Sequence, residues 1–241
     1  MEKSKLERFI SKYSLGGLCT SATIKYSDSK FLTAFKTDSN DLLGFVSVKD
    51  IDIDSDEVEF GIFNTVLLQR VLSAMRNEID VTFETENGQL VTMGLSDGSV
   101  NGNVLLADLN IMPDTPSMKQ VPDFQETVQI NPLFIDRFIK SRNAISHSNT
   151  FALIKSDNKL ELVINHSESH STDNISITLS DECESDGDFT MHFNSDLLKE
   201  VLNANKDITS GSIQISPEGL ILVNVSGEDF ICKYYIVMVQ V

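Results

Sequence analysis

Two stretches of twelve residues decide how this chain folds: Phe63-Asn64-Thr65-Val66-Leu67-Leu68-Gln69-Arg70-Val71-Leu72-Ser73-Ala74 and Phe193-Asn194-Ser195-Asp196-Leu197-Leu198-Lys199-Glu200-Val201-Leu202-Asn203-Ala204. They are identical at seven of twelve positions and lie 130 residues apart. Shorter matches keep nearly the same spacing, since residues 8–10 repeat at 137–139 and residues 27–30 resemble 156–159. An offset that persists along a chain indicates an internal duplication. The sequence therefore predicts two structural copies of one domain.

Each copy carries the same order of predicted elements. Apolar residues recur with a helical period at about 5–14 and 132–145. A second helix begins after Asn64 in one copy and after Asn194 in the other, because asparagine side chains cap exposed amides well. The clearest predicted strands are 41–49, 58–63, 173–180, 188–193, 208–215, 219–225 and 229–240. Two helices on a strand-rich layer make each half an α+β fold.

The segment between the copies differs in composition from both. Residues 112–124 hold three of the five prolines of the chain. Because proline fixes φ and lacks an N–H donor, this segment is expected to be extended and outside any sheet interior. We therefore predict a first domain at 1–111, a connector at 112–124 and a second domain at 125–241.

Composition and charge exclude several classes of protein. The chain has 241 residues, 41% of them hydrophobic, which is enough for folded cores, and its net charge is −17. A basic coat for nucleic acid or an anionic membrane is excluded as a global property. The longest apolar run, Tyr234 to Val239, is too short to cross a membrane, and three scattered cysteines without a CxxC motif predict reduced thiols. We expect an intracellular, cytoplasmic protein.

The four predicted helices differ in charge from the rest of the chain. Together they carry 11 basic and 5 acidic residues, a net charge of +6, whereas the remainder carries 8 basic and 31 acidic residues, a net charge of −23. Solvated helix faces commonly carry Lys and Arg, which is one interpretation. The other is that all four helices line one surface that contacts a polyanion through its phosphates.

The periodicity of the helices selects the residues for such contacts. In the first helix Leu6, Phe9 and Ile10 share a face that must pack on the sheet, which leaves Lys5, Arg8 and Lys12 opposite. Applied to all four helices, this argument predicts nine nucleic-acid-binding residues: Lys5, Arg8, Lys12, Arg70, Arg76, Arg137, Lys140, Lys199 and Lys206.

The duplication, the connector and the basic helices on an acidic body resemble a DNA polymerase sliding clamp (processivity factor). The likeness is to the tailed-bacteriophage type, which is related to proliferating cell nuclear antigen. Phe60-Gly61-Ile62-Phe63-Asn64 is similar to the strand that leads into the second helix of the family, and Glu126-Thr127-Val128-Gln129-Ile130 is similar to the strand that opens its second domain. The terminal Tyr234 to Val239 resembles the closing strand, with Val239 where the family commonly has proline.

The resemblance implies a ring of clamp-type domains around duplex DNA, bound without sequence specificity and with the helices lining the hole. Two-domain chains would form a homotrimer whose edge strands pair between subunits. DNA polymerase and the clamp loader would dock short hydrophobic peptides beside the connector; for a viral protein this occurs in the host cytoplasm. The residues onto which this partner-binding surface maps are Leu43, Phe45, Met112, Met118, Val121, Met238, Val239 and Val241.

Motifs of other kinds of site are weak or absent in the sequence. His166 and His170 lie four apart, but the polar residues around them favour a turn rather than a metal site. The acidic run 181–188 lacks the pattern of a calcium loop. No nucleophile, phosphate-loop or dinucleotide motif is present, so we expect no enzyme and no cofactor. The competing hypothesis is an acidic structural or assembly protein of a phage virion, built from duplicated β-rich domains, which leaves the cationic helices unexplained.

Overall fold

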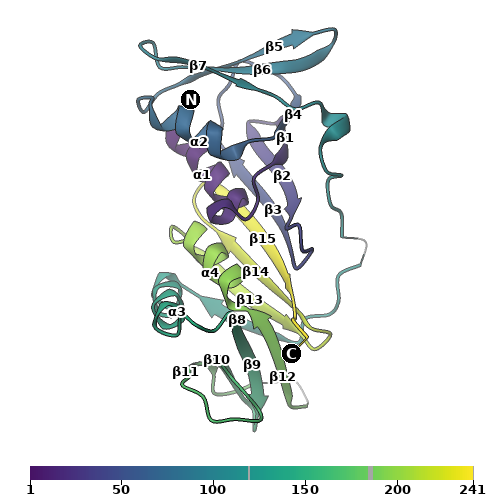
Figure 1. Ribbon diagram of the computed structural model, residues 1–241, viewed down its shortest axis with the longest axis vertical. Helices are drawn as coiled ribbons and strands as arrows, with labels where there is room; N and C mark the ends of the chain where they lie inside the picture. Colours follow the sequence, from purple (N-terminus) through teal and green to yellow (C-terminus); the bar gives the residue numbers. More distant parts are fainter. Residues whose placement is uncertain (119, 184–186, 241) are drawn as a thin grey trace. The chain divides into compact units, whose positions relative to one another are not determined.

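The computed structural model describes residues 1–118, 120–183 and 187–240 (Figure 1). The chain divides into two units, each assembled from more than one segment. Unit 1 comprises Met1–Thr37, Leu43–Ser117 and Glu228–Cys232. Unit 2 comprises Asp38–Leu42, Met118–Gly227 and residues 233–240.

Unit 1 places two helices against antiparallel strands (Figure 1). Its helices are α1 (Lys3–Ser14) and α2 (Thr65–Ser73), with short 3₁₀ turns at Leu15–Gly17 and Leu109–Ile111. Strands β1 (Ala22–Ser27), β2 (Lys30–Lys36), β3 (Leu42–Lys49) and β4 (Val58–Ile62) lie in the order β4-β1-β2-β3. A separate sheet contains β5 (Asp80–Glu86), β6 (Gln89–Ser96) and β7 (Asn101–Leu105) in sequence order.

Unit 2 repeats this arrangement with one more strand at its start (Figure 1). Its helices are α3 (Pro132–Ala144) and α4 (Ser195–Ala204). One sheet has the order β11-β10-β9-β12, from β9 (Thr150–Ser156), β10 (Lys159–Ile164), β11 (Ile175–Ser180) and β12 (Phe189–Asn194). The other strands run in the order β15-β14-β13-β8, from β8 (Glu126–Ile130), β13 (Ser210–Ser216), β14 (Leu220–Ser226) and β15 (Phe230–Val237).

The predicted duplication is confirmed in local detail. Asn64 caps α2 by accepting a hydrogen bond from the Leu67 amide at 2.9 Å, and Asn194 caps α4 by accepting from the Leu197 amide at 3.2 Å. The turns Asp28–Ser29 and Asp157–Asn158 both have two successive residues with positive φ, the conformation that a two-residue hairpin requires. Equivalent sequences therefore make equivalent structures, and the predicted α+β class is correct.

Each unit has its own aromatic core beneath its helices. In unit 1 the ring of Phe9 lies 5.4 Å from that of Phe31 and 5.5 Å from that of Tyr13, between centroids. In unit 2 the ring of Phe151 lies 5.9 Å from that of Phe138 and 5.6 Å from that of Phe193. Stacked and edge-on rings at these separations stabilise a core beyond their buried area. The helical apolar stripe predicted from the sequence is thus the buried one.

The division into units differs from the predicted domain boundaries at three places, one of which is Asp38–Leu42, predicted in the first domain and grouped with unit 2. The predicted connector 112–124 is shared, because Met112–Ser117 groups with unit 1 and the described residues from Met118 onward group with unit 2. Glu228–Cys232, predicted in the second domain, belongs to unit 1. The cause is α1: Arg8 forms an ion pair with Asp229, and the Lys12 Nζ lies 3.5 Å from the centroid of the Phe230 ring.

Candidate nucleic-acid interface and partner surface

The two helices of each unit pack side by side, α1 with α2 and α3 with α4 (Figure 1). Between α3 and α4, Arg142 donates to the Asp196 carboxylate at 2.8 Å and to the Ile145 carbonyl at 3.0 Å. The Arg142 side chain is 8% exposed, and its Nε has no hydrogen-bond partner among the described residues. Arg142 therefore holds the helix pair together, a role that the sequence did not indicate.

Five of the nine predicted nucleic-acid-binding side chains are well exposed. Lys140 makes an exposed ion pair with Asp136 on its own helix, at 2.7 Å. No ion pair is found for the other four within the part of the chain that the structure describes. The five exposed basic residues are Arg70, Arg76, Arg137, Lys140 and Lys206.

Two of these five lie just beyond the helices on which they were predicted. Helix α2 ends at Ser73, and beyond its end the Asp97 carboxylate accepts the backbone N–H of Arg76 at 2.8 Å. This hydrogen bond, with those from Val100 and Ser99, keeps the pKa of Asp97 far below its usual value. Helix α4 ends at Ala204, so Lys206 follows its C-terminal cap. Both side chains remain exposed.

The prediction for Lys12 is wrong, because this side chain does not face solvent. Its exposure is 0%, and its ammonium lies over the Phe230 ring in a cation–π contact. The segment Glu228–Cys232 covers the face of α1 that the helical period placed in solvent. A buried Lys12 stabilises unit 1 and does not contribute to a surface for phosphates.

Three other predicted residues are partly engaged within their own units. Arg8 pairs with Asp229, and its side chain is 34% exposed. The Lys5 Nζ donates to the Asp50 carbonyl at 2.8 Å. Lys199 lies 3.7 Å from the neighbouring Glu200 carboxylate. These residues remain available to water, but part of their positive charge is compensated locally.

The residues predicted to bind partners divide by exposure. In unit 2, Val121 and Met238 are exposed, Met118 and Val239 are half-buried, and the Val239 amide donates to the His192 carbonyl at 2.8 Å. In unit 1, Leu43 and Phe45 are half-buried. Val241 lies outside the described residues.

Met112 requires a correction. It is buried against β4, where a Cβ atom added to Gly61 would come within 2.8 Å of the Met112 Cγ. Glycine at position 61 is what permits this close approach. Met112 is therefore a packing residue of unit 1 and is not presented to a partner.

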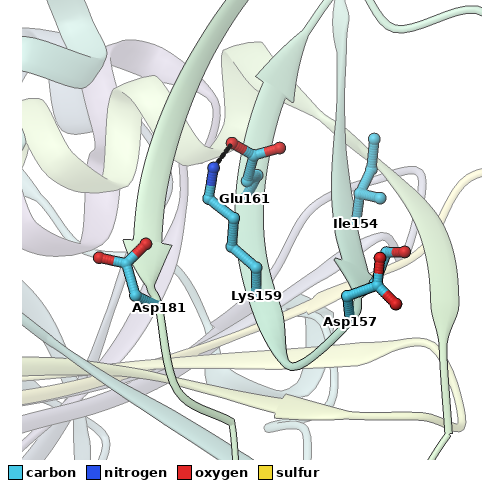
Figure 2. Close-up of a pocket in the computed structure, with 6 residues that line it drawn as sticks. Ile154, Asp157, Lys159, Glu161 and Asp181 are labelled. Carbon is cyan, nitrogen blue, oxygen red and sulfur yellow. Dashed lines mark hydrogen bonds and ion pairs between the residues drawn. The ribbon is translucent and has the colours of Figure 1, made fainter.

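An open recess of about 450 Å³ lies on the sheet of β9 and β10, lined by Ile154, Ser156, Asp157, Lys159, Glu161 and Asp181 (Figure 2). The Lys159 Nζ donates to the Glu161 carboxylate at 2.7 Å, which raises the pKa of Lys159 and lowers that of Glu161. Both charges thus stabilise each other. Among the described residues, the lining includes no His, Cys or Arg side chain.

Neither a cluster of metal ligands nor a membrane-spanning helix is found among the described residues. In residues 1–118, 120–183 and 187–240, no group of three or more His, Cys, Asp or Glu side chains is placed to hold a metal ion. No helix in this part of the chain is long and apolar enough to cross a membrane.

The two repeated α+β units have the fold of the sliding clamps. Three solved structures to which this chain is similar are of PCNA (proliferating cell nuclear antigen). A. fulgidus PCNA, with the C-terminal region of FEN-1 bound, has a TM-score of 0.76 and 14% identity, covering 100% of this chain and 97% of that one. PCNA from Entamoeba histolytica has a TM-score of 0.74 and 14% identity, covering 99% of this chain and 96% of that one.

A PCNA2–PCNA3 complex from Sulfolobus tokodaii has a TM-score of 0.73 and 13% identity, covering 99% of this chain and 97% of that one. No protein-family model and no curated protein matches the sequence. The predicted clamp resemblance is therefore confirmed at the level of the fold.

Proposed function

We propose that this chain is a sliding clamp: three copies close into a ring that encircles duplex DNA and tethers the replicative DNA polymerase for processive synthesis. The observation that carries this proposal is the charge partition, +6 on the four helix segments and −23 on the rest of the chain. Contacts from Lys and Arg to phosphates position a protein on DNA without reading its sequence. A basic lining on an acidic body therefore suits a ring that slides.

Ring closure needs two different surfaces on one chain that fit each other. Strands β7 of unit 1 and β11 of unit 2 each end a sheet, and no strand in the described residues pairs with their outer edges. Neither strand contains a charged residue or proline, which commonly protect an open edge. These edges support pairing of β7 of one copy with β11 of the next.

An exposed apolar patch lies beside β7. Phe63 and Leu67, at the start of α2, are 67% and 45% exposed, and Val66 between them is exposed as well. Their repeat equivalents Phe193 and Leu197 are only 0% and 5% exposed. Because identical residues are buried in the other copy of the repeat, the simplest occupant of this patch is another protein surface.

The helix that carries Val66 and Leu67 of this patch lies against β7, the edge proposed to pair with the next copy. Helix α2 packs directly on β7, since a Cβ atom at Gly102 would lie 2.6 Å from the Val71 Cγ1. Unit 2 exposes a counterpart, Leu133 on α3, which is 65% exposed. We name Phe63, Val66 and Leu67 the α2 patch and assign it to the contact between neighbouring copies.

Reversing the exposed charges should weaken the hold on DNA. The variant Arg76→Glu/Arg137→Glu/Lys206→Glu is expected to leave nicked circular DNA faster than the unmodified ring at physiological salt, because three attractive phosphate interactions per chain become repulsive. In equilibrium binding, the slope of log K against log salt should fall by about 0.9 for each phosphate that is no longer neutralised. Retention is measured by gel filtration of the DNA complex.

The matched control reverses the same number of positive charges on strands instead of on the helix segments. Lys25→Glu/Lys30→Glu/Lys36→Glu reverses three exposed lysines on strands β1 and β2. This variant should be retained as well as the unmodified protein. Equal loss of retention in both variants would mean that net charge, and not a helix-lined surface, governs binding.

We further propose that polymerase and clamp loader dock hydrophobic peptides on the exposed residues of the connector and C-terminus. The PCNA of A. fulgidus binds the C-terminal region of FEN-1, which supports a peptide-binding role for this fold. Val121→Asp/Met238→Asp places two carboxylates in an apolar contact and should weaken peptide binding at least about tenfold.

The measurement is stimulation of the cognate polymerase on primed circular DNA, with the oligomeric state checked in parallel. Val100→Asp, on an exposed loop of unit 1, serves as the control. Full stimulation by an assembled Val121→Asp/Met238→Asp ring would place the docking surface elsewhere.

A further inference from the structure

The four histidines of the chain all lie in unit 2, and two of them face each other. The Nδ1 of His166 and the Nε2 of His192 are 3.4 Å apart, with ring centroids separated by 5.5 Å and ring planes inclined by 36°. Both side chains are half-buried. His166 follows β10, and His192 lies in β12.

The backbone holds both imidazoles in place. His192 is opposite Ala152 in the β9–β12 register, and it lies between Met191 and Phe193, whose side chains are buried on the other face. The chain after β10 returns on itself, since the Thr172 hydroxyl donates to the Asn165 carbonyl at 2.7 Å and the Asn165 side-chain Nδ2 donates to the Asp173 carbonyl at 2.8 Å. This closed turn presents His166 to β12.

The separation of the two nitrogens fits a shared ligand better than a strong hydrogen bond. Hydrogen bonds from N–H donors are usually about 2.7–3.2 Å long. Two imidazole nitrogens that bind one tetrahedral Zn²⁺ at about 2.0–2.1 Å are about 3.3–3.4 Å apart. The observed 3.4 Å matches this separation.

The electrostatic surroundings also favour a cation. Glu168, on the same turn as His166, places a negative charge near His192. A bound divalent ion would be attracted by this carboxylate.

We propose that His166 and His192 bind one divalent transition-metal ion, with Zn²⁺ as the representative, and that water fills its remaining coordination positions. Imidazole nitrogen is a preferred ligand of Zn²⁺, Cu²⁺ and Ni²⁺. The site has two protein ligands and is open to exchange, unlike a closed structural zinc centre. The bound ion cross-links the turn 165–173 to β12, whose His192 carbonyl also accepts the Val239 amide of the C-terminal tail.

The first test follows the imidazole resonances of the full-length protein by NMR during titration with Zn²⁺ at pH 7.5. The chain supplies four histidine signals, and His147 and His170 serve as internal controls in the same spectrum. The proposal predicts that the signals of His166 and His192 shift together and saturate at one ion per chain. Shifts confined to His147 or His170, or no shift at all, would overturn it.

The second test measures affinity by competition with a fluorescent zinc chelator under reducing conditions, because Cys19, Cys183 and Cys232 are free thiols. Mutation of a residue that only hydrogen-bonds to a metal ligand typically lowers metal affinity about tenfold or more. Removal of a ligand itself should lower the Zn²⁺ affinity by at least that factor. His166→Ala and His192→Gln are both expected to show this loss, and the exposed control His170→Ala is not. Equal affinity in all three variants would refute the assignment, and circular dichroism verifies that each variant is folded.

Discussion

A charge placed in the α2 patch should convert the ring to monomers. The variant Phe63→Glu/Leu67→Glu is expected to have a solution mass of 26.8 kDa, in place of about 80 kDa for three chains. An uncompensated charge buried in an interface costs about 3–5 kcal/mol. The proposed trimeric ring would contain three such interfaces, so the penalty would apply three times. Light scattering over a concentration series is the measurement.

The control introduces the same charge at an exposed apolar residue outside the α2 patch. Ile231 in unit 1 is 57% exposed, and Ile231→Glu should leave the trimer unchanged. A second variant, Thr178→Lys, puts a cation on the open edge of β11 and should weaken assembly independently of α2. A trimer that persists with both Phe63→Glu/Leu67→Glu and Thr178→Lys would show that copies meet through other surfaces, or not as a ring.

The largest loss of stability should come from a buried ion pair in unit 2. The Lys155 Nζ lies 3.1 Å from the Glu126 carboxylate, and the two side chains are 1% and 10% exposed. Lys155→Met leaves the Glu126 charge buried without this partner, which should lower the free energy of unfolding by about 3–5 kcal/mol. Urea denaturation, followed by a probe in unit 2, gives the value.

A surface pair of similar geometry provides the comparison. Lys140 and Asp136 are 2.7 Å apart but 75% and 57% exposed, so Lys140→Met should cost less than about 1 kcal/mol. Replacing both partners of the buried pair, as Lys155→Met/Glu126→Gln, should recover much of the loss. If Lys155→Met loses no more stability than Lys140→Met, burial of the unpaired Glu126 charge does not destabilise unit 2 as expected.

The helices and their beginnings were predictable because their signals are local. Asn64 and Asn194 each precede an apolar helical stripe, and a cap depends only on amides two or three residues away. Proline at the start of the third helix acts over the same short range. The predicted ranges of α1 and α3 consequently agree with the structure to within about two residues.

The exposure of individual side chains was less predictable because it depends on distant parts of the chain. Lys12 is buried by Phe230, which lies 218 residues later in the sequence. Met112 is buried because glycine at position 61 leaves space for it. The identical Phe63 and Phe193 differ in exposure although the repeat predicts equivalence. In each case the deciding contact is tertiary, and a local periodicity contains no information about it.

The attachment of Glu228–Cys232 to unit 1 affects how the chain is made. A ribosome that has completed Ser117 must add 110 more residues before Glu228, which takes about 5–22 s at about 5–20 residues per second. Throughout that interval α1 lacks Asp229 and Phe230, and Arg8 and Lys12 have neither of these contacts. The N-terminal unit is thus completed only when Glu228–Cys232 has been made, so a nascent chain that terminates before this segment retains an unfinished first unit.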